Sequence, residues 1–355
     1  MTEHTFSTKL AGVPPPLRPV SNPPNPWATS EIEYFDGEAP VAPLEVFEDH
    51  TRGILAHNDS PDVGFSWSVN PYRGCFHACA YCYARPSHEY LSFGAGTDFD
   101  RKIVVKTRAA ELLREAFDDP KWSGELVAFS GVTDCYQPLE ASYRLTRSCL
   151  EACAEYRNPV AVITKSPLVE RDIDVLQALA TGARASVSVS VPFWDEVKAR
   201  AIEPFVTTPA RRMRTIGRLA AAGLRVGVMV APIVPGLNDE DIGDVLRAAR
   251  DAGATWAGSV LLRLPGPVKD VFSERLRAAL PLRAERVLRR IRETRGGKLY
   301  DARFGVRGSG EGPYAAAIQS LFERTATALG LATAGVGGAD GPTTFRRPRG
   351  QLALF

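Results

Sequence analysis

No hydrophobic run in the 355-residue sequence approaches the ~20 residues that a helix needs to cross a bilayer, so we expect no membrane-spanning segment. The start, Met1-Thr2-Glu3-His4, lacks the charged and apolar regions of a secretory leader. Only six cysteines occur over this length, which disfavours the disulfide framework of a small secreted protein. Together these absences predict a protein of the reducing cytoplasm.

Net charge is also low, at +2, but the basic residues are unevenly distributed. All five histidines lie in the first quarter of the chain, whereas arginines crowd the last third. Only Glu274, Glu285 and Glu293 offset the nine basic residues of one segment, which are Arg275, Arg277, Arg283, Arg286, Arg289, Arg290, Arg292, Arg295 and Lys298. This segment is either a solvated helix face or a surface that contacts phosphates.

The two ends of the chain differ in composition from its middle. Residues 1–45 are rich in proline and lack hydrophobic periodicity, so we expect a mostly disordered or extended arm there. Residues 331–355 begin with a small, glycine-rich stretch that is typical of a flexible linker. The core domain is therefore predicted over residues 60–300, followed by a helical extension over residues 301–330.

Within the core, short β-rich runs alternate with amphipathic stretches. The predicted strands are residues 65–69, 125–129, 160–164, 185–191, 225–231 and 258–262, and the helical patterns cover 109–117, 139–156, 168–180, 210–222, 239–252 and 281–294. Strands that alternate with helices indicate an α/β fold with a parallel sheet. Right-handed crossovers would curl that sheet into a partial (β/α)6 barrel of the TIM type. In such barrels the chemistry lies on the loops that follow the strands.

Three cysteines, Cys75, Cys79 and Cys82, follow the first predicted strand with the spacing C-x3-C-x2-C. A cubane [4Fe–4S] cluster takes one thiolate per iron, so three cysteines would leave the fourth iron open to a small-molecule ligand. A zinc knuckle is the alternative, but it needs a second pair of ligands. His77 is the only local candidate, and it lies within the same short loop, where tetrahedral closure would be strained.

With Tyr81 directly before the third cysteine, the motif resembles the signature of the radical S-adenosylmethionine (SAM) enzymes. Over residues 60–265 the chain is similar to the spore photoproduct lyase branch, which is linked to DNA repair. The residues that carry this resemblance are Cys75, Cys79, Tyr81, Cys82, Tyr83, Thr133, Asp134, Lys165, Ser190, Glu203, Pro204, Ala231 and Pro232. The resemblance implies a [4Fe–4S] cluster on the three cysteines, at which SAM is reductively cleaved to a 5′-deoxyadenosyl radical.

The same resemblance implies SAM contacts for residues at or near the strand ends, which are Tyr81, Tyr83, Thr133, Asp134, Lys165, Ser190 and Ala231. The ammonium of Lys165, directly after the third predicted strand, can pair with the methionyl carboxylate of SAM. The alternative is that Lys165 is a solvated lysine at a strand end with no role in SAM binding. Ser190 ends a strand in which serines alternate with valines, so the hydroxyls share one face. The two tyrosines either contact the adenosyl group or only pack.

One position departs from the family pattern. In spore photoproduct lyases a cysteine close after the second strand returns a hydrogen atom to the product radical. Matching Thr133-Asp134 to the family places Gly131 there. Cys135, four residues later, is the candidate for this catalytic role, with a core or rim thiol as the alternative. Cys149 and Cys153 share one helical face and are expected to be buried small hydrophobes.

The last five residues resemble the Q-L-x-L-F peptide with which bacterial repair and replication proteins dock on the DNA sliding clamp. Leu352, Leu354 and Phe355 would be apolar anchors and Gln351 a hydrogen-bonding group. The alternative is a tail that folds back onto the barrel. The leading hypothesis is thus a radical SAM enzyme that acts on nucleic acid and receives electrons from a separate donor. Radical modification of a protein or small molecule, or a metal-binding adaptor on the clamp, are the other hypotheses.

Overall fold

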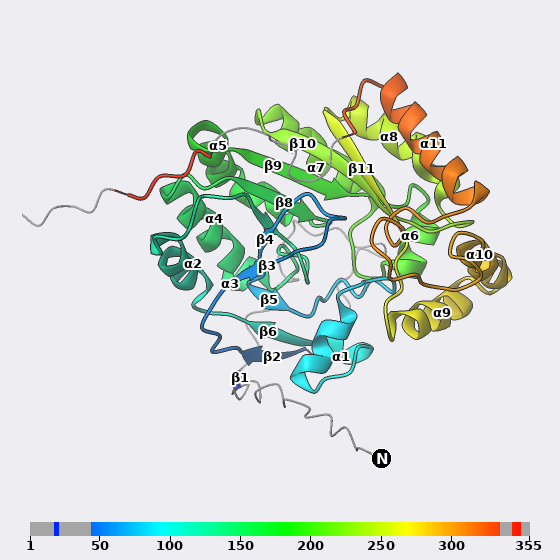
Figure 1. Cartoon of the computed structure of the whole chain (residues 1–355), viewed down its shortest axis with the longest axis horizontal. Coiled ribbons are helices and arrows are strands. Elements are labelled where there is room, and N and C mark those ends of the chain that lie inside the picture. Colours follow the sequence, from blue (N-terminus) through cyan, green and yellow to red (C-terminus); the bar gives the residue numbers. More distant parts are fainter. Residues whose placement is uncertain (1–17, 21–43, 334–342, 349–355) are drawn as a thin grey trace, which may run out of the picture.

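The computed structural model describes residues 18–20, 44–333 and 343–348, and its central feature is a seven-stranded sheet (Figure 1). Six neighbouring strands are parallel and follow one another in chain order, which confirms the predicted parallel sheet and partial barrel. They are β4 (Trp67–Val69), β7 (Val127–Phe129), β8 (Val160–Thr164), β9 (Ala185–Ser190), β10 (Arg225–Ile233) and β11 (Trp256–Leu261). The seventh strand, β3 (Leu55–His57), pairs antiparallel with β4 at one edge.

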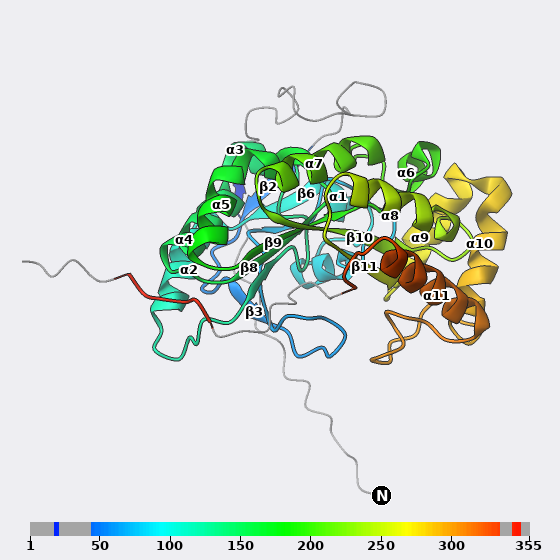
Figure 2. The same ribbon diagram turned by 90° about the horizontal axis from the view of Figure 1, so that it is seen from above.

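Helices with one buried apolar face lie along the outer side of this sheet (Figures 1 and 2). They are α2 (Ala109–Asp118), α4 (Leu145–Glu155), α5 (Ile173–Gly182), α7 (Pro209–Ala221), α8 (Ile242–Asp251) and α11 (Pro313–Ala328). The predicted helix 139–156 is divided into α3 (Glu140–Tyr143) and α4, because Arg144 adopts a left-handed conformation with φ 54°. Within the described residues no helix is both long and apolar enough to span a membrane.

A second, four-stranded sheet was not predicted from the sequence. Its order is β1-β2-β6-β5, and its strands are β1 (Arg18–Val20), β2 (Glu45–Glu48), β5 (Tyr72–Arg73) and β6 (Lys102–Val105). Strands of four residues or fewer are too short to show a clear alternation of apolar and polar residues. β1 lies within the predicted arm 1–45, so part of that arm pairs with the folded domain.

The chain after β11 returns to the edge of the barrel. Helices α9 (Val268–Ala279) and α10 (Pro281–Glu293) lie at one end of the molecule, and α11 packs on α8 (Figure 2). The backbone N–H of Leu261, the last residue of β11, donates a hydrogen bond to the carbonyl of Gly308 at 2.7 Å. The β3–β4 loop reaches the same segment, because Asp62 accepts a hydrogen bond from the backbone N–H of Gly305 at 2.7 Å. The predicted helical extension 301–330 is therefore joined to both edges of the sheet.

Residues 343–348, which we call the C-terminal strap, pack against the outside of the barrel instead of forming part of a free linker. Phe345 stacks on Tyr156, with 6.2 Å between the ring centroids, and it makes an edge-to-face contact with Phe117. The guanidinium of Arg347 donates to the backbone carbonyl of Phe117 at 3.0 Å. The terminal residues Gln351, Leu352, Leu354 and Phe355 lie outside the described residues.

Candidate active site

The cysteine loop follows β4, as the sequence predicts, with the short strand β5 between them, and its backbone is fixed before the first cysteine. Gly74 has a φ of +77°, and a Cβ there would come within 2.8 Å of His88 and 2.9 Å of the Phe99 carbonyl. Only glycine suits this combination of conformation and crowding. The Cys75 N–H then donates to the Phe99 carbonyl at 2.9 Å. The loop therefore starts from a rigid anchor.

Thr133 and Asp134, two predicted SAM contacts, hold this loop and a strand end together. The Thr133 hydroxyl donates to the Gly74 carbonyl at 2.6 Å. One carboxylate oxygen of Asp134 accepts from the Thr164 hydroxyl and the other from the Lys165 N–H, both at 2.7 Å. These bonds occupy much of the polar capacity of both side chains, so their direct effect is to position the cysteine loop beside the end of β8.

His77 connects the cysteine loop to the same carboxylate. Its Nδ1 lies 3.4 Å from Asp134 Oδ2, and both side chains are buried. Burial acts to lower the pKa of His77, but electrostatic interactions and hydrogen bonds with Cys75 and Asp134 outweigh it and raise the pKa to about 10. Burial acts to raise the pKa of Asp134, but hydrogen bonds from His77, Thr164 and Lys165 lower it to about 2. His77 and Asp134 thus form a charged pair under the loop.

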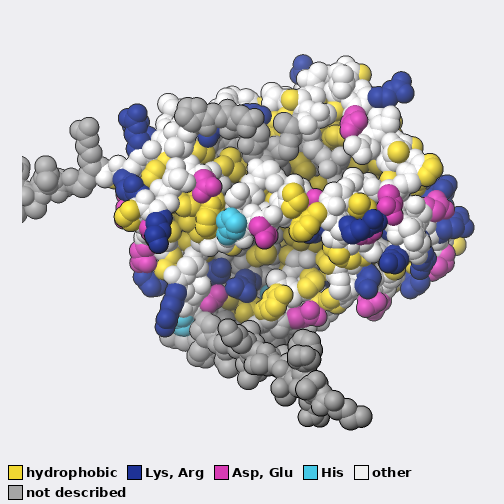
Figure 3. All heavy atoms as spheres, viewed as in Figure 1, with side chains coloured by type: hydrophobic (Ala, Val, Ile, Leu, Met, Phe, Trp, Pro, Cys, Tyr) yellow, Lys and Arg dark blue, Asp and Glu magenta, His cyan; other side chains and the backbone are white. Residues whose placement is uncertain are grey.

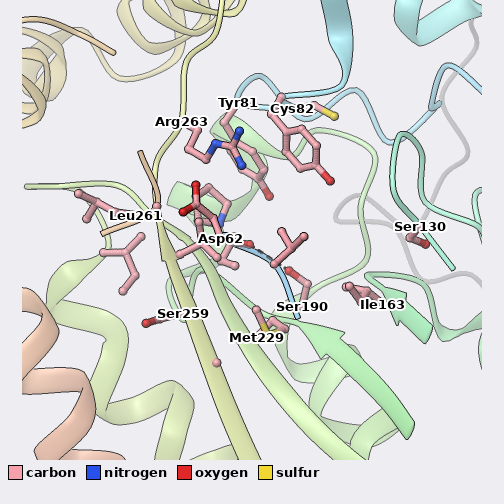
Figure 4. A pocket seen from close by; sticks show the side chains of 18 of the residues that line it. Asp62, Tyr81, Cys82, Ser130, Ile163, Ser190, Met229, Ser259, Leu261 and Arg263 are labelled. Atoms are coloured by element: carbon pink, nitrogen blue, oxygen red, sulfur yellow. Dashed lines mark hydrogen bonds between the residues drawn. The ribbon is translucent and has the colours of Figure 1, made fainter. Parts of the chain in front are cut away.

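The three cysteines and the predicted SAM contacts line a single cavity of about 550 Å³ at the ends of the strands (Figure 4). This volume is in the usual range for a cofactor or small-molecule site. The predicted residues in its wall are Cys75, Cys79, Tyr81, Cys82, Tyr83, Thr133, Asp134, Lys165, Ser190 and Ala231. They come from segments as far apart as residues 75 and 231, and only the fold brings them together.

Lys165 is the one basic residue among the predicted SAM contacts, and it lies in the cavity wall. Its Nζ lies 5.7 Å from the centroid of the Tyr81 ring. Burial acts to lower the pKa of Lys165, but negative charge at Cys79, Glu203 and Asp134 outweighs it and raises the pKa. Lys165 is therefore a protonated group that faces the cavity and can pair with an anionic ligand.

A buried network behind the cavity fixes Tyr81 and the end of β9. The Tyr81 hydroxyl donates to Glu203, and the other oxygen of Glu203 accepts from Arg212 at 2.7 Å. Arg212 also donates to the Ser190 carbonyl at 2.9 Å, while the Ser190 hydroxyl donates to the Ala231 carbonyl at 3.0 Å. Burial and negative charge at Cys79 and Glu203 raise the pKa of Tyr81, so its phenol stays protonated.

The cysteine arrangement fits a cluster better than a single ion. All three thiols are free, Cys75 and Cys79 are buried, and Cys82 is half-buried. Burial raises the pKa of Cys79 and raises that of Cys82 to about 11, so both would need a metal to be held as thiolates. In the described part of the chain, no group of three His, Cys, Asp or Glu side chains is arranged to share one metal ion. A cubane binds each thiolate to a different iron, so this spacing is compatible with [4Fe–4S].

The structure does not bring Cys135 to the site. Its side chain is fully buried in the main hydrophobic core and is absent from the cavity wall. The backbone N–H of Cys135 donates to Ser130 at 2.9 Å, which turns this segment inward. The core-thiol alternative is the one that the structure favours. Cys149 and Cys153 are likewise fully buried in that core.

Sequence reasoning missed Arg263, which enters the cavity beside Asp62, Tyr81 and Cys82 (Figure 4). It stands two residues after the end of β11. The signal was the one used for Lys165, a basic residue just beyond a parallel strand. It was overlooked because the leucine- and proline-rich segment around it matches no motif.

The basic segment lies mostly in α9 and α10, and acidic side chains lie among the basic ones on its surface (Figure 3). Arg277 pairs with Glu285 at 2.9 Å and Arg290 with Glu293 at 2.7 Å. Arg295 is buried, so it belongs to the interior. The segment is therefore less positive toward solvent than its sequence indicates.

Comparisons with known proteins agree with this geometry. The uncharacterized protein Rv2578c of Mycobacterium tuberculosis is 41% identical over 210 residues, which are 59% of this chain and 62% of that protein. The uncharacterized protein MJ0683 of Methanocaldococcus jannaschii is 28% identical over 182 residues, which cover 51% of this chain and 66% of the relative. The chain thus matches less than two thirds of the length of these relatives.

Solved structures with the same fold include a cysteine-to-serine mutant of spore photoproduct lyase, with a TM-score of 0.57, 14% identity and coverage of 81% of each chain. Spore photoproduct lyase complexed with a dinucleoside spore photoproduct gives a TM-score of 0.56 at 14% identity, covering 81% of this chain and 80% of that one. The model of the radical SAM superfamily matches residues 69–249, which is just over half of the 355 residues. The chain therefore belongs to the radical SAM superfamily, whose members are enzymes that use a [4Fe–4S] cluster and SAM.

Proposed function

We propose that this protein holds a [4Fe–4S] cluster on Cys75, Cys79 and Cys82, cleaves SAM reductively and acts on nucleic acid. The observation that carries the proposal is that three free thiols and the protonated Lys165 line one cavity at the strand ends. When bound, the cluster would supply one electron to SAM and so a 5′-deoxyadenosyl radical. A separate electron donor would have to reduce it.

The residues of the chain have distinct roles in this proposal. Lys165 pairs with the carboxylate of SAM through a charge-assisted hydrogen bond. Tyr81, held by Glu203, offers a fixed aromatic face, and Ser190 offers a hydroxyl at the end of β9. Thr133 and Asp134 keep the cysteine loop in place.

Two observations support a nucleic acid substrate. Spore photoproduct lyase, which shares the fold, has been solved in complex with a dinucleoside spore photoproduct. On α10, Arg286 is exposed, and no hydrogen bond or ion pair joins it to another described residue, so it is free to contact phosphate. Repair and modification of the nucleic acid are both compatible with these observations.

The cluster and the activity are tested together. After anaerobic reconstitution with iron and sulfide, the reduced protein is expected to convert SAM to 5′-deoxyadenosine. Cys79→Ala is expected to lose both iron and this conversion, while Cys153→Ala, which alters only the core, keeps both. Unchanged iron content in the Cys79→Ala protein would contradict the proposal, and an iron protein without SAM cleavage would favour the adaptor hypothesis.

The substrate class is tested by binding. Purified holoprotein is titrated with duplex DNA, single-stranded DNA and tRNA of matched length at fixed salt concentration, because nucleic acid affinities depend strongly on salt. Saturable binding to at least one of them is expected. Absence of binding to all three would favour a protein or small-molecule substrate.

We further propose that the terminal peptide docks on the DNA sliding clamp through Gln351, Leu352, Leu354 and Phe355. Leucine and phenylalanine anchors beside a hydrogen-bonding glutamine match recognition by an apolar groove. The C-terminal strap supports the idea, because it fixes the chain to the barrel only a few residues before this peptide.

A further inference from the structure

Arg263 is a cation in the cavity wall, just beyond the end of β11. No hydrogen bond or ion pair joins its guanidinium to another described residue, and its Nε is buried without a hydrogen-bond partner. The guanidinium lies 5.5 Å from the centroid of the Tyr83 ring. A buried donor that stays unsatisfied is unfavourable, so it points to a ligand that fills the space.

The carboxylates near Arg263 are already engaged. Asp62 accepts hydrogen bonds from the Gly305 N–H, at 2.7 Å, and from Arg307. The positive charge of Arg263 contributes to lowering the pKa of Asp62, but it does so without a hydrogen bond between the two side chains. Glu323, elsewhere in the cavity wall, accepts from Gln319 at 2.9 Å. Neither side chain therefore neutralises Arg263 directly.

A second buried guanidinium holds the segment in place. Arg295 donates to the carbonyls of Leu262 at 2.7 Å and Arg307 at 2.9 Å, which joins the chain next to Arg263 to the returning C-terminal segment. Arg307 donates to Asp62 directly, whereas Arg263 acts on it only through its charge. Asp301 and Glu311, the carboxylates that act on Arg295, both pair with Arg303. Arg263 is therefore left without a directly paired carboxylate and is available to an anion.

Tyr83 places an aromatic face beside the guanidinium of Arg263. Its hydroxyl donates to the Gly131 carbonyl at 2.7 Å, and the side chain is 50% exposed, so the fixed ring leaves one part of its face open. A planar guanidinium against an aromatic face can take a phosphate through its N–H fork while a base lies beside the ring. Lys165 remains available for SAM, because it lies at the end of a different strand, β8.

We propose that Arg263 binds a phosphate group of the substrate, next to Tyr83, and so positions a nucleotide at the β11 end of the cavity. This inference rests on the proposed nucleic acid substrate. It assigns Arg263 and Lys165 to two different anions in one cavity, the phosphate of the substrate and the carboxylate of SAM.

The experiment compares charged and neutral backbones. The reconstituted holoprotein with SAM is titrated with deoxy- and ribodinucleotides that cover all base combinations, and with their methylphosphonate counterparts, which have the same shape without the charge. The wild type is expected to prefer the charged form by about ten- to a hundredfold, the range for a charge-assisted bond. Arg263→Gln is expected to lose this preference and keep its affinity for SAM.

Two further variants serve as controls. Arg108→Gln removes the same charge from an exposed position outside the cavity wall and is expected to retain the preference. Arg263→Lys keeps the charge but not the fork and is expected to show an intermediate preference. A full preference in Arg263→Gln, or a loss of SAM affinity instead, overturns the assignment. If the wild type binds a longer nucleic acid but no dinucleotide, the phosphate site fails and the nucleic acid substrate stands. If it binds neither, both fail.

Discussion

The hydroxyl of Tyr83 donates a hydrogen bond to the carbonyl of Gly131 at 2.7 Å, across the wall of the cavity. Gly131 stands where the resemblance to spore photoproduct lyases places a hydrogen-donating cysteine. A Cβ at Gly131 would come within 3.1 Å of both Asn70 and Ser68. A side chain there would require Asn70 and Ser68 to move by a few tenths of an ångström, and the Asn70 side chain is held by the hydrogen bond that it accepts from the Gly131 N–H at 2.8 Å. The family thiol has no space at this position without a shift of its neighbours.

Gly131→Ala is therefore expected to destabilise the protein by about 1–3 kcal/mol, as overpacking of a fitted site does. Denaturant unfolding of the purified protein measures the change. Gly182→Ala is the matched control, because a Cβ there has no atom within 4 Å, and this change is expected to be neutral or stabilising. Equal stability of Gly131→Ala and wild type would show that Asn70 and Ser68 yield easily.

Lys165→Met removes a charge from the cavity and keeps an unbranched stem. Loss of the charge-assisted bond is expected to weaken SAM binding by about ten- to a hundredfold. Equilibrium dialysis with the reconstituted protein measures the dissociation constant. Lys121→Met, which changes an exposed lysine outside the cavity, is the control and leaves the constant unchanged. A wild-type constant in Lys165→Met would remove Lys165 from the SAM site.

Phe345→Ala tests the C-terminal strap. Phe345 packs on Tyr156 and Phe117, so its truncation is expected to lower the free energy of unfolding by about 1–3 kcal/mol, less than for a fully buried phenylalanine. Thermal unfolding is the measurement. Tyr90→Ala removes a 78% exposed ring and is expected to have little effect. An unchanged melting temperature for Phe345→Ala would mean that the strap adds no stability.

The terminal peptide is tested separately from the strap. A peptide that covers Gly350 to Phe355 is expected to bind purified sliding clamp with micromolar affinity, because the cost of ordering a short peptide on binding offsets part of the gain from burying its anchors. Replacing Leu354 and Phe355 by Ala in the whole protein should abolish clamp binding and spare SAM cleavage. Phe345→Ala should change neither clamp binding nor SAM cleavage. No clamp binding at high micromolar concentration would refute the docking proposal.

Glu170 gives a pH dependence of stability. Burial acts to raise its pKa, but hydrogen bonds from Arg211, Thr215 and Arg218 outweigh it, and the pKa falls below the ordinary 4.5. A lowered folded pKa means that the stabilisation is present above the unfolded value and is lost as the pH falls through the folded value. The difference in melting temperature between wild type and Glu170→Gln should therefore be largest near neutral pH and shrink below about pH 4. A difference in melting temperature that is the same near neutral pH and below about pH 4 would contradict this expectation.

The sequence alone determined the features whose signal is local. Cys75, Cys79 and Cys82 lie within eight residues, so their spacing is legible without a fold. The six parallel strands were predicted because each is a separate short run of strand-forming residues that alternates with amphipathic helical stretches. Lys165 was found because it directly follows such a run, and the structure places it in the cavity wall.

Only the tertiary structure decided what depends on contacts between distant segments. Tyr81 and Glu203 are 122 residues apart in the chain, and Asp62 and Gly305 are 243 apart. No periodicity records such pairs, because periodicity describes one element at a time. Sequence position made Cys135 a candidate hydrogen donor, with a core or rim thiol as the alternative, and the packed chain places it in the core. Arg263 became a candidate only when the fold left it facing a cavity without a partner, since burial and pairing are properties of the packed chain.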